Sequence, residues 1–167
     1  MNRRLLLQLA AALSLTFASI LAIAVAARAE AGTIEVREAF ARATIGPATS
    51  GVVYVTLVNR ASRPDRLLAA STPVAARTDL HMTVRDGDVV RMRRLETVEI
   101  PAGESVAFEP GGAHVMLSGL HAPLREGDRF DLTLEFEAAG PITVEVPVKS
   151  VAAGADTGDD GHGHGGH

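Results

Sequence analysis

The sequence predicts an all-β domain, a sandwich or barrel of short strands, and three observations support this prediction. Apolar and polar residues alternate with a period of two, most clearly over residues 130–136 and 142–148. Turn signals rich in Gly, Pro and Asp separate such runs at short intervals. No stretch of the domain has convincing helical periodicity. These features together are typical of β-sandwiches and barrels.

The first 29 residues have the features of a signal peptide and are not expected in the fold. Arg3 and Arg4 form a positively charged start, residues 5–26 are mainly apolar, and residues 27–29 have the small-x-small form of a cleavage site. We expect cleavage before Glu30, a periplasmic location and no membrane insertion of the mature chain. The apolar run is long, so an uncleaved anchor is the alternative. No cysteine follows it, which argues against a lipoprotein.

Length and charge limit the classes of function. A chain of 167 residues with 47% hydrophobic content is sufficient for one domain, which we assign to residues 30–150. Loss of the leader leaves 13 basic against 20 acidic residues, a net charge of about −7, which disfavours nucleic acid as a partner. The chain has no cysteine. It therefore has no disulfide, and a blue-copper electron-transfer site is excluded because that site requires a thiolate.

The first strands of the domain differ in how their apolar residues are arranged. Ile34, Val36 and Phe40 alternate with charged residues, which predicts a strand with one face in the core. Residues 52–59 are apolar on both faces, as expected of a central, fully covered strand. Turn signals at residues 63–65 and 72–73 bound a short strand around Leu67 and Leu68.

The middle of the domain begins with a predicted hairpin. Residues 77–85 and 89–95 read as strands joined by a two-residue turn, Asp86-Gly87. With this turn His81 lies directly opposite Met92, and directly opposed residues share a face. Leu80, Met82 and Val84 form an apolar stripe at period two, so Met82 is expected to pack in the core.

The remaining strands follow in order. Residues 97–100 and 105–108 flank the turn at 101–103, a further strand carries His114 and Met116, and the Gly140-Pro141 turn joins residues 130–136 to residues 142–148.

Histidine and methionine residues are concentrated between residues 80 and 117. His81 is followed by ten residues and Met92, then by twenty-one residues and His114, then by one residue and Met116. His114 and Met116 lie two apart on a predicted strand and therefore point the same way. Thioether sulfur selects Cu(I) over hard cations, and imidazole is compatible with copper. Zinc would more often take Cys or carboxylate ligands. We therefore expect one Cu(I) site built from His81, Met92, His114 and Met116.

This spacing resembles the signature of the PCuAC family of periplasmic copper chaperones. Every position of that signature is filled, and the similarity extends over roughly residues 33–150 through Ser50-Gly51 and the turns near residues 101–103, 110–112 and 127–128. The resemblance implies a cupredoxin-like Greek-key fold, with Met82 as a substitute ligand if a bulge turns it toward the ion. It also implies delivery of Cu(I) to the copper centre of cytochrome c oxidase subunit II, or to another copper-accepting periplasmic protein, alongside a thiol-bearing copper chaperone.

Other functions explain the same residues less well. The sequence contains no additional base or nucleophile pattern, so we expect no enzyme activity. A periplasmic copper sequestration or uptake protein would share the site but not the partner. A β-sandwich that only mediates interactions would bind no metal in its folded domain.

Two charged features remain. Residues 151–167 change to Gly, Asp and Ala and are expected to form a disordered tail, in which His162, His164 and His167 suit Cu(II) as an accessory site. An expression tag is the alternative, although the glycine spacing is unlike one. Four arginines crowd the hairpin and form either a charged strand edge or a docking patch for an acidic partner: Arg85, Arg91, Arg93 and Arg94.

Overall fold

The computed structural model describes residues 34–87 and 89–154. These residues form ten strands: β1 (Ile34–Arg42), β2 (Ser50–Asn59), β3 (Asp65–Ser71), β4 (Ala75–Asp86), β5 (Val89–Leu95), β6 (Val98–Ile100), β7 (Ser105–Phe108), β8 (Ala113–Leu120), β9 (Arg129–Phe136) and β10 (Gly140–Lys149). The described part of the chain contains no helix, and hence none that could cross a membrane. The all-β prediction is confirmed. The predicted leader and the three tail histidines lie outside the described residues.

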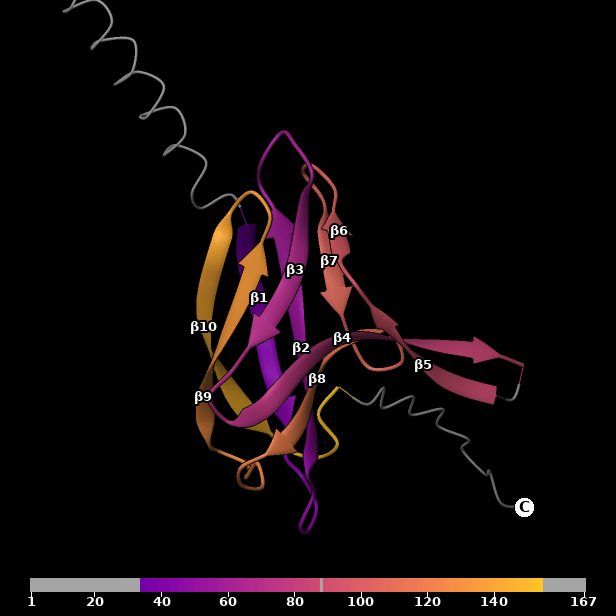
Figure 1. Cartoon of the computed structure of the whole chain (residues 1–167), viewed down its shortest axis with the longest axis vertical. Coiled ribbons are helices and arrows are strands. Elements are labelled where there is room, and N and C mark those ends of the chain that lie inside the picture. The colour runs from indigo at the N-terminus through magenta and orange to yellow at the C-terminus, as the bar shows by residue number, and fades with distance from the viewer. Residues whose placement is uncertain (1–33, 88, 155–167) are drawn as a thin grey trace, which may run out of the picture.

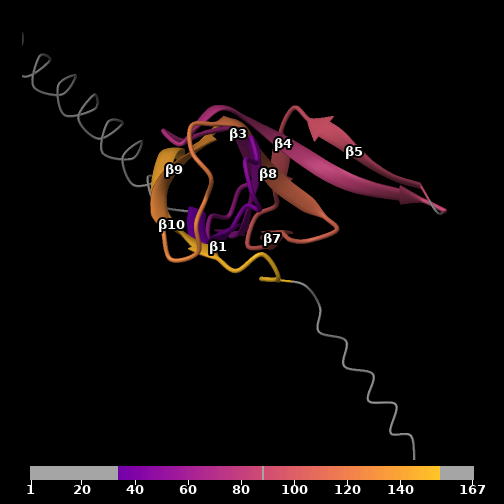
Figure 2. The ribbon, with the colours of Figure 1, turned by 90° about the horizontal axis from the view of Figure 1, so that it is seen from below.

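The strands form one continuous sheet in the order β5-β4-β8-β7-β2-β1-β10-β9-β3-β6, with an additional pairing of β8 with β2. A parallel pairing of β1 with β10 joins its two halves. The sheet curls so that the halves face each other, and Figures 1 and 2 show the strands arranged around a common interior. Residues from both halves belong to one buried cluster, including Val53, Leu57, Leu117, Leu67, Leu132 and Leu134. This shared core determines which face points outward in the strands that contribute buried residues to it.

Most of the predicted strands, and the burial predicted for their faces, agree with the structure. β2 pairs with β1, β7 and β8, and both of its faces contain buried residues, as its apolar sequence predicted. β9 and β10 form the expected hairpin, but Gly140 and Pro141 belong to β10 and pair with Phe136 and Glu135, so the connection is residues 137–139 and not the predicted Gly140-Pro141 turn. The turn at residues 101–103 does not form a hairpin, because the two strands that it joins pair with other strands: β6 pairs with β3, and β7 pairs with β2. It therefore carries the chain from one half of the sheet to the other.

The alternation predicted for the first strand is wrong at its end. A register shift between Arg37 and Phe40 inserts an extra residue into β1, and Glu38 there has a φ of 52°. This β-bulge reverses the faces of the residues that follow. Ala41 is consequently in the core, and Phe40 packs on Tyr54 with ring centroids 5.3 Å apart.

The folded chain extends beyond the predicted boundary at residue 150. Residues 151–154 form turns, and the Arg42 Nε donates a hydrogen bond to the Ala153 carbonyl at 2.6 Å. Gly154 lies against Phe40 and Pro110. The start of the predicted tail is thus attached to the domain, whereas residues 155–167 lie outside the described residues.

Candidate metal site

The β4–β5 hairpin brings His81 and Met92 onto one face, although not directly opposite each other. Asp86 pairs with Val89, so the loop begins at Gly87, which has a φ of 57°. Glycine tolerates a positive φ better than aspartate does, and this favours the observed turn over the predicted Asp86-Gly87 turn. His81 consequently opposes Arg94, and Met92 opposes Thr83. The observed register thus differs from the predicted one by two residues, an even number, so His81 and Met92 remain on the same face as diagonal neighbours.

The pairing of β4 with β8 brings the two histidines together. His81 lies directly opposite His114 in this antiparallel ladder. Their ring centroids are 5.9 Å apart, and the rings are nearly perpendicular, with an interplanar angle of 73°. Metal–imidazole bonds of about 2.0–2.1 Å put two rings that share one ion roughly 5–6 Å apart. The two imidazoles are therefore spaced to bind the same ion.

Met116 completes the set on the same face. It lies two residues beyond His114 on β8 and opposite Asp79 on β4. The opposite face of these strands carries Leu80, Val115 and Leu117, which are in the core. We call the outer face of β5, β4 and β8, which carries His81, Met92, His114 and Met116, the His/Met face.

Met82 lies on the core side of β4. It packs against the buried cluster, as the apolar stripe predicted. Neither ladder of β4 has a register shift at this position, so the bulge that a Met82 ligand would require is absent from the described hairpin. Met82 therefore points away from the His/Met face.

The surroundings of His114 favour its neutral imidazole. The residue is only 4% exposed, and its Nδ1 lies 3.2 Å from the Gly112 carbonyl oxygen. A carbonyl can only accept, so Nδ1 carries the proton and Nε2 keeps its lone pair. Burial lowers the pKa of His114, the bond to Gly112 raises it, and the nearby His81 lowers it further. The net effect is a lowered pKa, which favours the neutral form that binds metal.

His81 has a nitrogen without a partner. Its Nδ1 is buried and makes no hydrogen bond to any described residue. Leaving a buried polar atom unsatisfied costs about 1–3 kcal/mol. A bound metal ion would remove this cost if the nitrogen served as a ligand, so the residues present fit a metal site.

Asp79 is a feature of the site that sequence reasoning missed. Its carboxylate is nearly buried and binds two arginines, with Arg77 Nε 2.9 Å from Oδ2 and Arg94 Nε 3.2 Å from Oδ1. The available signal was its position two residues before His81, which places it on the same face. Arg94 belongs to β5 and Asp79 to β4, so the contact ties the two strands together beside the candidate ligands.

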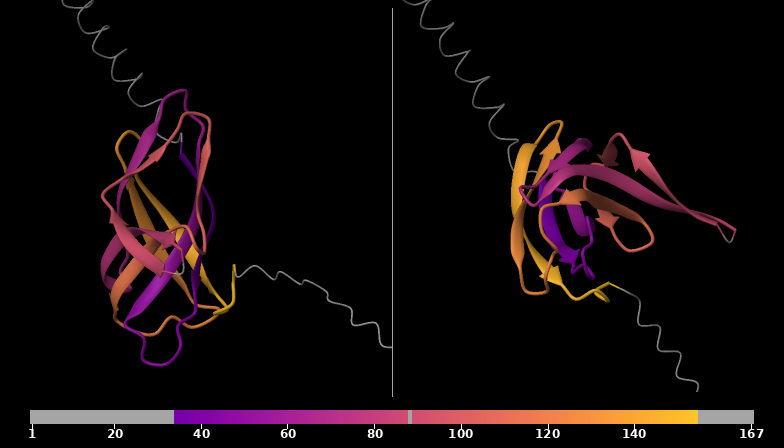
Figure 3. Two further views of the ribbon diagram at one scale, coloured as in Figure 1. Left: turned by 90° about the vertical axis from the view of Figure 1, so that its right-hand side faces the viewer. Right: turned by 60° about the horizontal axis from the view of Figure 1, so that its bottom comes forward.

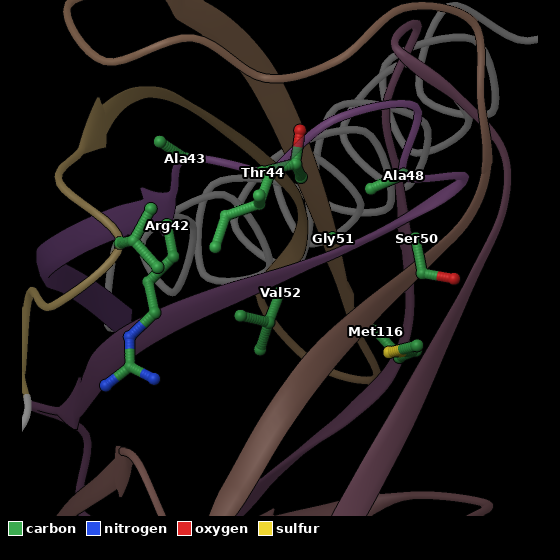
Figure 4. A pocket seen from close by; sticks show the side chains of 10 residues that line it. Arg42, Ala43, Thr44, Ala48, Ser50, Gly51, Val52 and Met116 are labelled. Carbon is green, nitrogen blue, oxygen red and sulfur yellow. The ribbon is translucent and has the colours of Figure 1, made fainter.

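A pocket of about 360 Å³ adjoins Met116. Figure 4 shows Met116 on one side of it, Arg42 on the other and Val52 between them. Neither histidine of the His/Met face lines this pocket. The half-buried Met116 side chain thus borders a pocket that neither histidine lines.

The candidate donor atoms on this face are two imidazole nitrogens and two thioether sulfurs. Within residues 34–87 and 89–154, no group of three or more His, Asp or Glu side chains is placed to hold a metal ion. Met92 is the most accessible of the four candidate ligands, with 63% of its surface exposed. A neutral set of soft and intermediate ligands suits Cu(I).

Comparison with known proteins assigns the family. The family described as putative lipoprotein LpqE-like matches residues 34–148. This chain belongs to the LpqE-like family. The putative lipoprotein Lxx21020 of Leifsonia xyli subsp. xyli is 31% identical over 121 residues, which cover 72% of each chain. The name of that relative describes a lipoprotein, whereas this chain contains no cysteine.

Solved structures give the same result for the fold. The copper-bound PCuAC domain from PmoF2 matches with a TM-score of 0.62 and 28% identity, covering 72% of this chain and 95% of that domain. The Cu(I) form of DR1885 from Deinococcus radiodurans matches with a TM-score of 0.55 and 31% identity, covering 66% of this chain and 74% of that one. The LpqE-like family is thus PCuAC-type, and the predicted cupredoxin-like fold is confirmed.

Proposed function

We propose that this protein is an exported copper chaperone. In this proposal it binds one Cu(I) through His81, Met92, His114 and Met116 and delivers it to the copper centre of cytochrome c oxidase subunit II. The observation that supports the proposal is that these four side chains, from three strands, lie on the same outer face, with the two imidazoles directly opposite each other. The similarity to copper-bound PCuAC domains supports the choice of metal.

The properties of the site favour a carrier over a permanent metal centre. Its four ligands are uncharged when the histidines are neutral, which suits a monovalent ion. The exposed Met92 lies on a strand at the edge of the sheet. Its thioether can leave the ion and give way to a ligand of the acceptor. The proposal therefore assigns binding and transfer of copper, without catalysis.

The site is tested by anaerobic titration of the mature chain, residues 30–167, against a chromophoric Cu(I) chelator. His162, His164 and His167 are replaced by alanine in all samples, so that the tail contributes no binding. We expect one tightly bound equivalent. Loss of groups that merely orient a ligand costs about tenfold to a hundredfold in affinity, so Met92→Leu and His114→Ala should each cost at least about tenfold.

Two residues outside the His/Met face provide matched controls. Met82→Leu removes a thioether on the core side of the same hairpin, and His121→Ala removes an exposed imidazole from a loop. Both should keep the affinity of the parent. Equal losses in Met82→Leu and Met92→Leu would contradict the assignment. Copper-limited growth of a deletion strain, with cytochrome c oxidase activity as readout, separates delivery from sequestration or uptake.

A further inference from the structure

The β4–β5 hairpin extends beyond the body of the domain. The last residue of β4 that pairs with β8 is Met82, opposite Ala113, and Thr83 N donates to the Gly112 carbonyl. From Val84 onward the hairpin pairs only with itself. Figures 1 and 3 show it projecting away from the curled sheet. An isolated two-stranded ribbon is marginally stable in water, so this extension needs an explanation beyond the fold.

The hairpin has an unusual surface for such a position. Every residue that the structure describes from Val84 to Arg94 is exposed. Val84, Val89, Val90 and Met92 account for four of the seven large hydrophobic residues exposed in the described chain. The segment also carries four arginines in a protein with a net charge of −4. Within the described residues Arg85, Arg91 and Arg93 have no carboxylate partner.

The two faces of the hairpin carry different charges. Arg77, Arg85 and Arg94 lie on the His/Met face, where Asp79 is the one carboxylate on β4 or β5. Arg91 and Arg93 lie on the opposite face with Asp86, as the register requires. The His/Met face is thus the more positive of the two. A bound Cu(I) would add a further positive charge to it.

His81 lies midway between the charges on its own face. Arg77, Asp79, His81, Thr83 and Arg85 succeed one another at alternate positions of β4. At roughly 3.3 Å per residue, Arg77 and Arg85 are about 26 Å apart, with His81 at the centre. Arg77 and Arg94 are 71% and 73% exposed although they bind Asp79, so their guanidinium groups can reach a partner.

We propose that the His/Met face of the hairpin is the docking surface for an acidic copper-accepting protein. This inference rests on the proposed function. Carboxylates of the acceptor, on both sides of its metal-binding groups, meet Arg77 and Arg94 at one end and Arg85 at the other. An apolar side chain of the acceptor packs on Val90. Docking on this face brings the acceptor's ligands to the copper, which direct ligand exchange requires. Arg91 and Arg93 face away from the acceptor.

The test measures the rate of Cu(I) transfer from the full mature chain to the copper-free soluble domain of cytochrome c oxidase subunit II by stopped flow at low ionic strength. Charge complementarity acts mainly on the association rate. We expect Arg85→Gln to slow the second-order step about threefold to tenfold. The control Arg91→Gln/Arg93→Gln removes two charges from the other face and should change the rate less than about twofold. Added salt should abolish the difference.

Each variant is also titrated with the Cu(I) chelator, which separates docking from metal binding. Parent affinity combined with slowed transfer in Arg85→Gln supports the docking surface. Unchanged transfer in Arg85→Gln, or equal slowing in the Arg91→Gln/Arg93→Gln control, overturns the docking surface and leaves copper binding intact. A parent protein that binds Cu(I) but transfers none to this acceptor overturns the delivery step, and the docking surface with it.

Discussion

Asp79 connects the strand that carries Met92 to the strand that carries His81. Its side chain is 6% exposed and forms ion pairs with Arg94 of β5 and Arg77 of β4. Arg94 lies two residues from Met92 on the same face of β5. The Asp79 to Arg94 contact therefore limits how far β5 can move from the histidines. We infer that Asp79 positions Met92 without touching the metal itself.

Substitutions at Asp79 should reveal this positioning role. Asp79→Asn and Arg94→Gln should each weaken Cu(I) binding severalfold, and the pair should show a coupling energy of about 0.5–1 kcal/mol in chelator titrations. Arg77→Gln is the matched control, because Arg77 binds the same carboxylate from the same strand. If Arg77→Gln weakens binding as much as Arg94→Gln does, the connection between strands is not the cause.

The buried His114 makes the stability of the metal-free protein depend on pH. Its folded-state pKa is lowered, mainly by burial, below the ordinary value of about 6.5. The neutral imidazole therefore makes its full contribution to the free energy of unfolding when the pH is above about 6.5. As the pH falls, His114 takes up a proton in the unfolded chain before it does so in the folded chain. The free energy of unfolding therefore decreases until the pH reaches the folded-state pKa of His114. Urea unfolding of the metal-free protein should show this loss as the pH is lowered through about 6.5.

The control for this prediction is the His114→Gln variant, which keeps a polar side chain that does not titrate. Its free energy of unfolding should fall less over the same pH range. A pH dependence identical to that of the parent would show that other groups are responsible.

At the scale of the element, the β4–β5 hairpin depends on the conformation of Gly87. The φ of 57° is one that residues with a Cβ adopt at a cost of roughly 1–2 kcal/mol, and open space surrounds the position of an added Cβ. Gly87→Ala should therefore destabilise the hairpin through backbone strain alone. Amide exchange at Val84 and Arg91, which face each other across the ladder, should accelerate, while exchange in β9 is unchanged. Gly87→Asn should be milder, because asparagine tolerates this conformation.

Sequence patterns predicted the strands well because the patterns are local. The alternation over residues 130–136 depends only on which face is buried, and β9 and β10 confirm it. Two local irregularities were not predictable in the same way. The bulge in β1 moves Phe40 out of the core, and the hairpin turn starts one residue later than the Asp-Gly signal indicates. Both depend on small backbone energies that the alternation does not report.

The part of the candidate site that depends on local structure was predicted, and the part that depends on long-range strand pairing was not. The prediction that His81 and Met92 share a face holds despite the change of register, because the register differs by two residues, an even number. The direct opposition of His81 and His114 depends instead on the pairing of β4 with β8, which are separated by β5, β6 and β7 in the chain. Local propensity does not determine such a long-range pairing. The ligand chemistry predicted that the two His/Met pairs share one ion, but the direct opposition of the two histidines was not predicted.

At the scale of the whole molecule, one core supports a site that lies outside it. The inner faces of β4 and β8 contribute Leu80 and Val115 to the same cluster as Leu132 of β9. A fully buried leucine replaced by alanine usually costs about 2–5 kcal/mol. Leu132→Ala should lower the free energy of unfolding by this amount, measured in urea with an unchanged m-value. A changed m-value would indicate that the two halves of the sheet do not unfold together.

Copper binding should add to this stability independently of the core. Cu(I) at about 100 times its dissociation constant stabilises a protein that binds it only when folded by about 2.7 kcal/mol. Leu132 lies on β9, in the half of the sheet that does not carry the His/Met face. Distant sites contribute additively, so parent and Leu132→Ala should gain equal stability from Cu(I) under anaerobic conditions. Met92→Leu should gain less at the same Cu(I) concentration, because its affinity is lower. A gain in Leu132→Ala that differs from the parent by more than about 0.5 kcal/mol would mean that the core deforms the His/Met face.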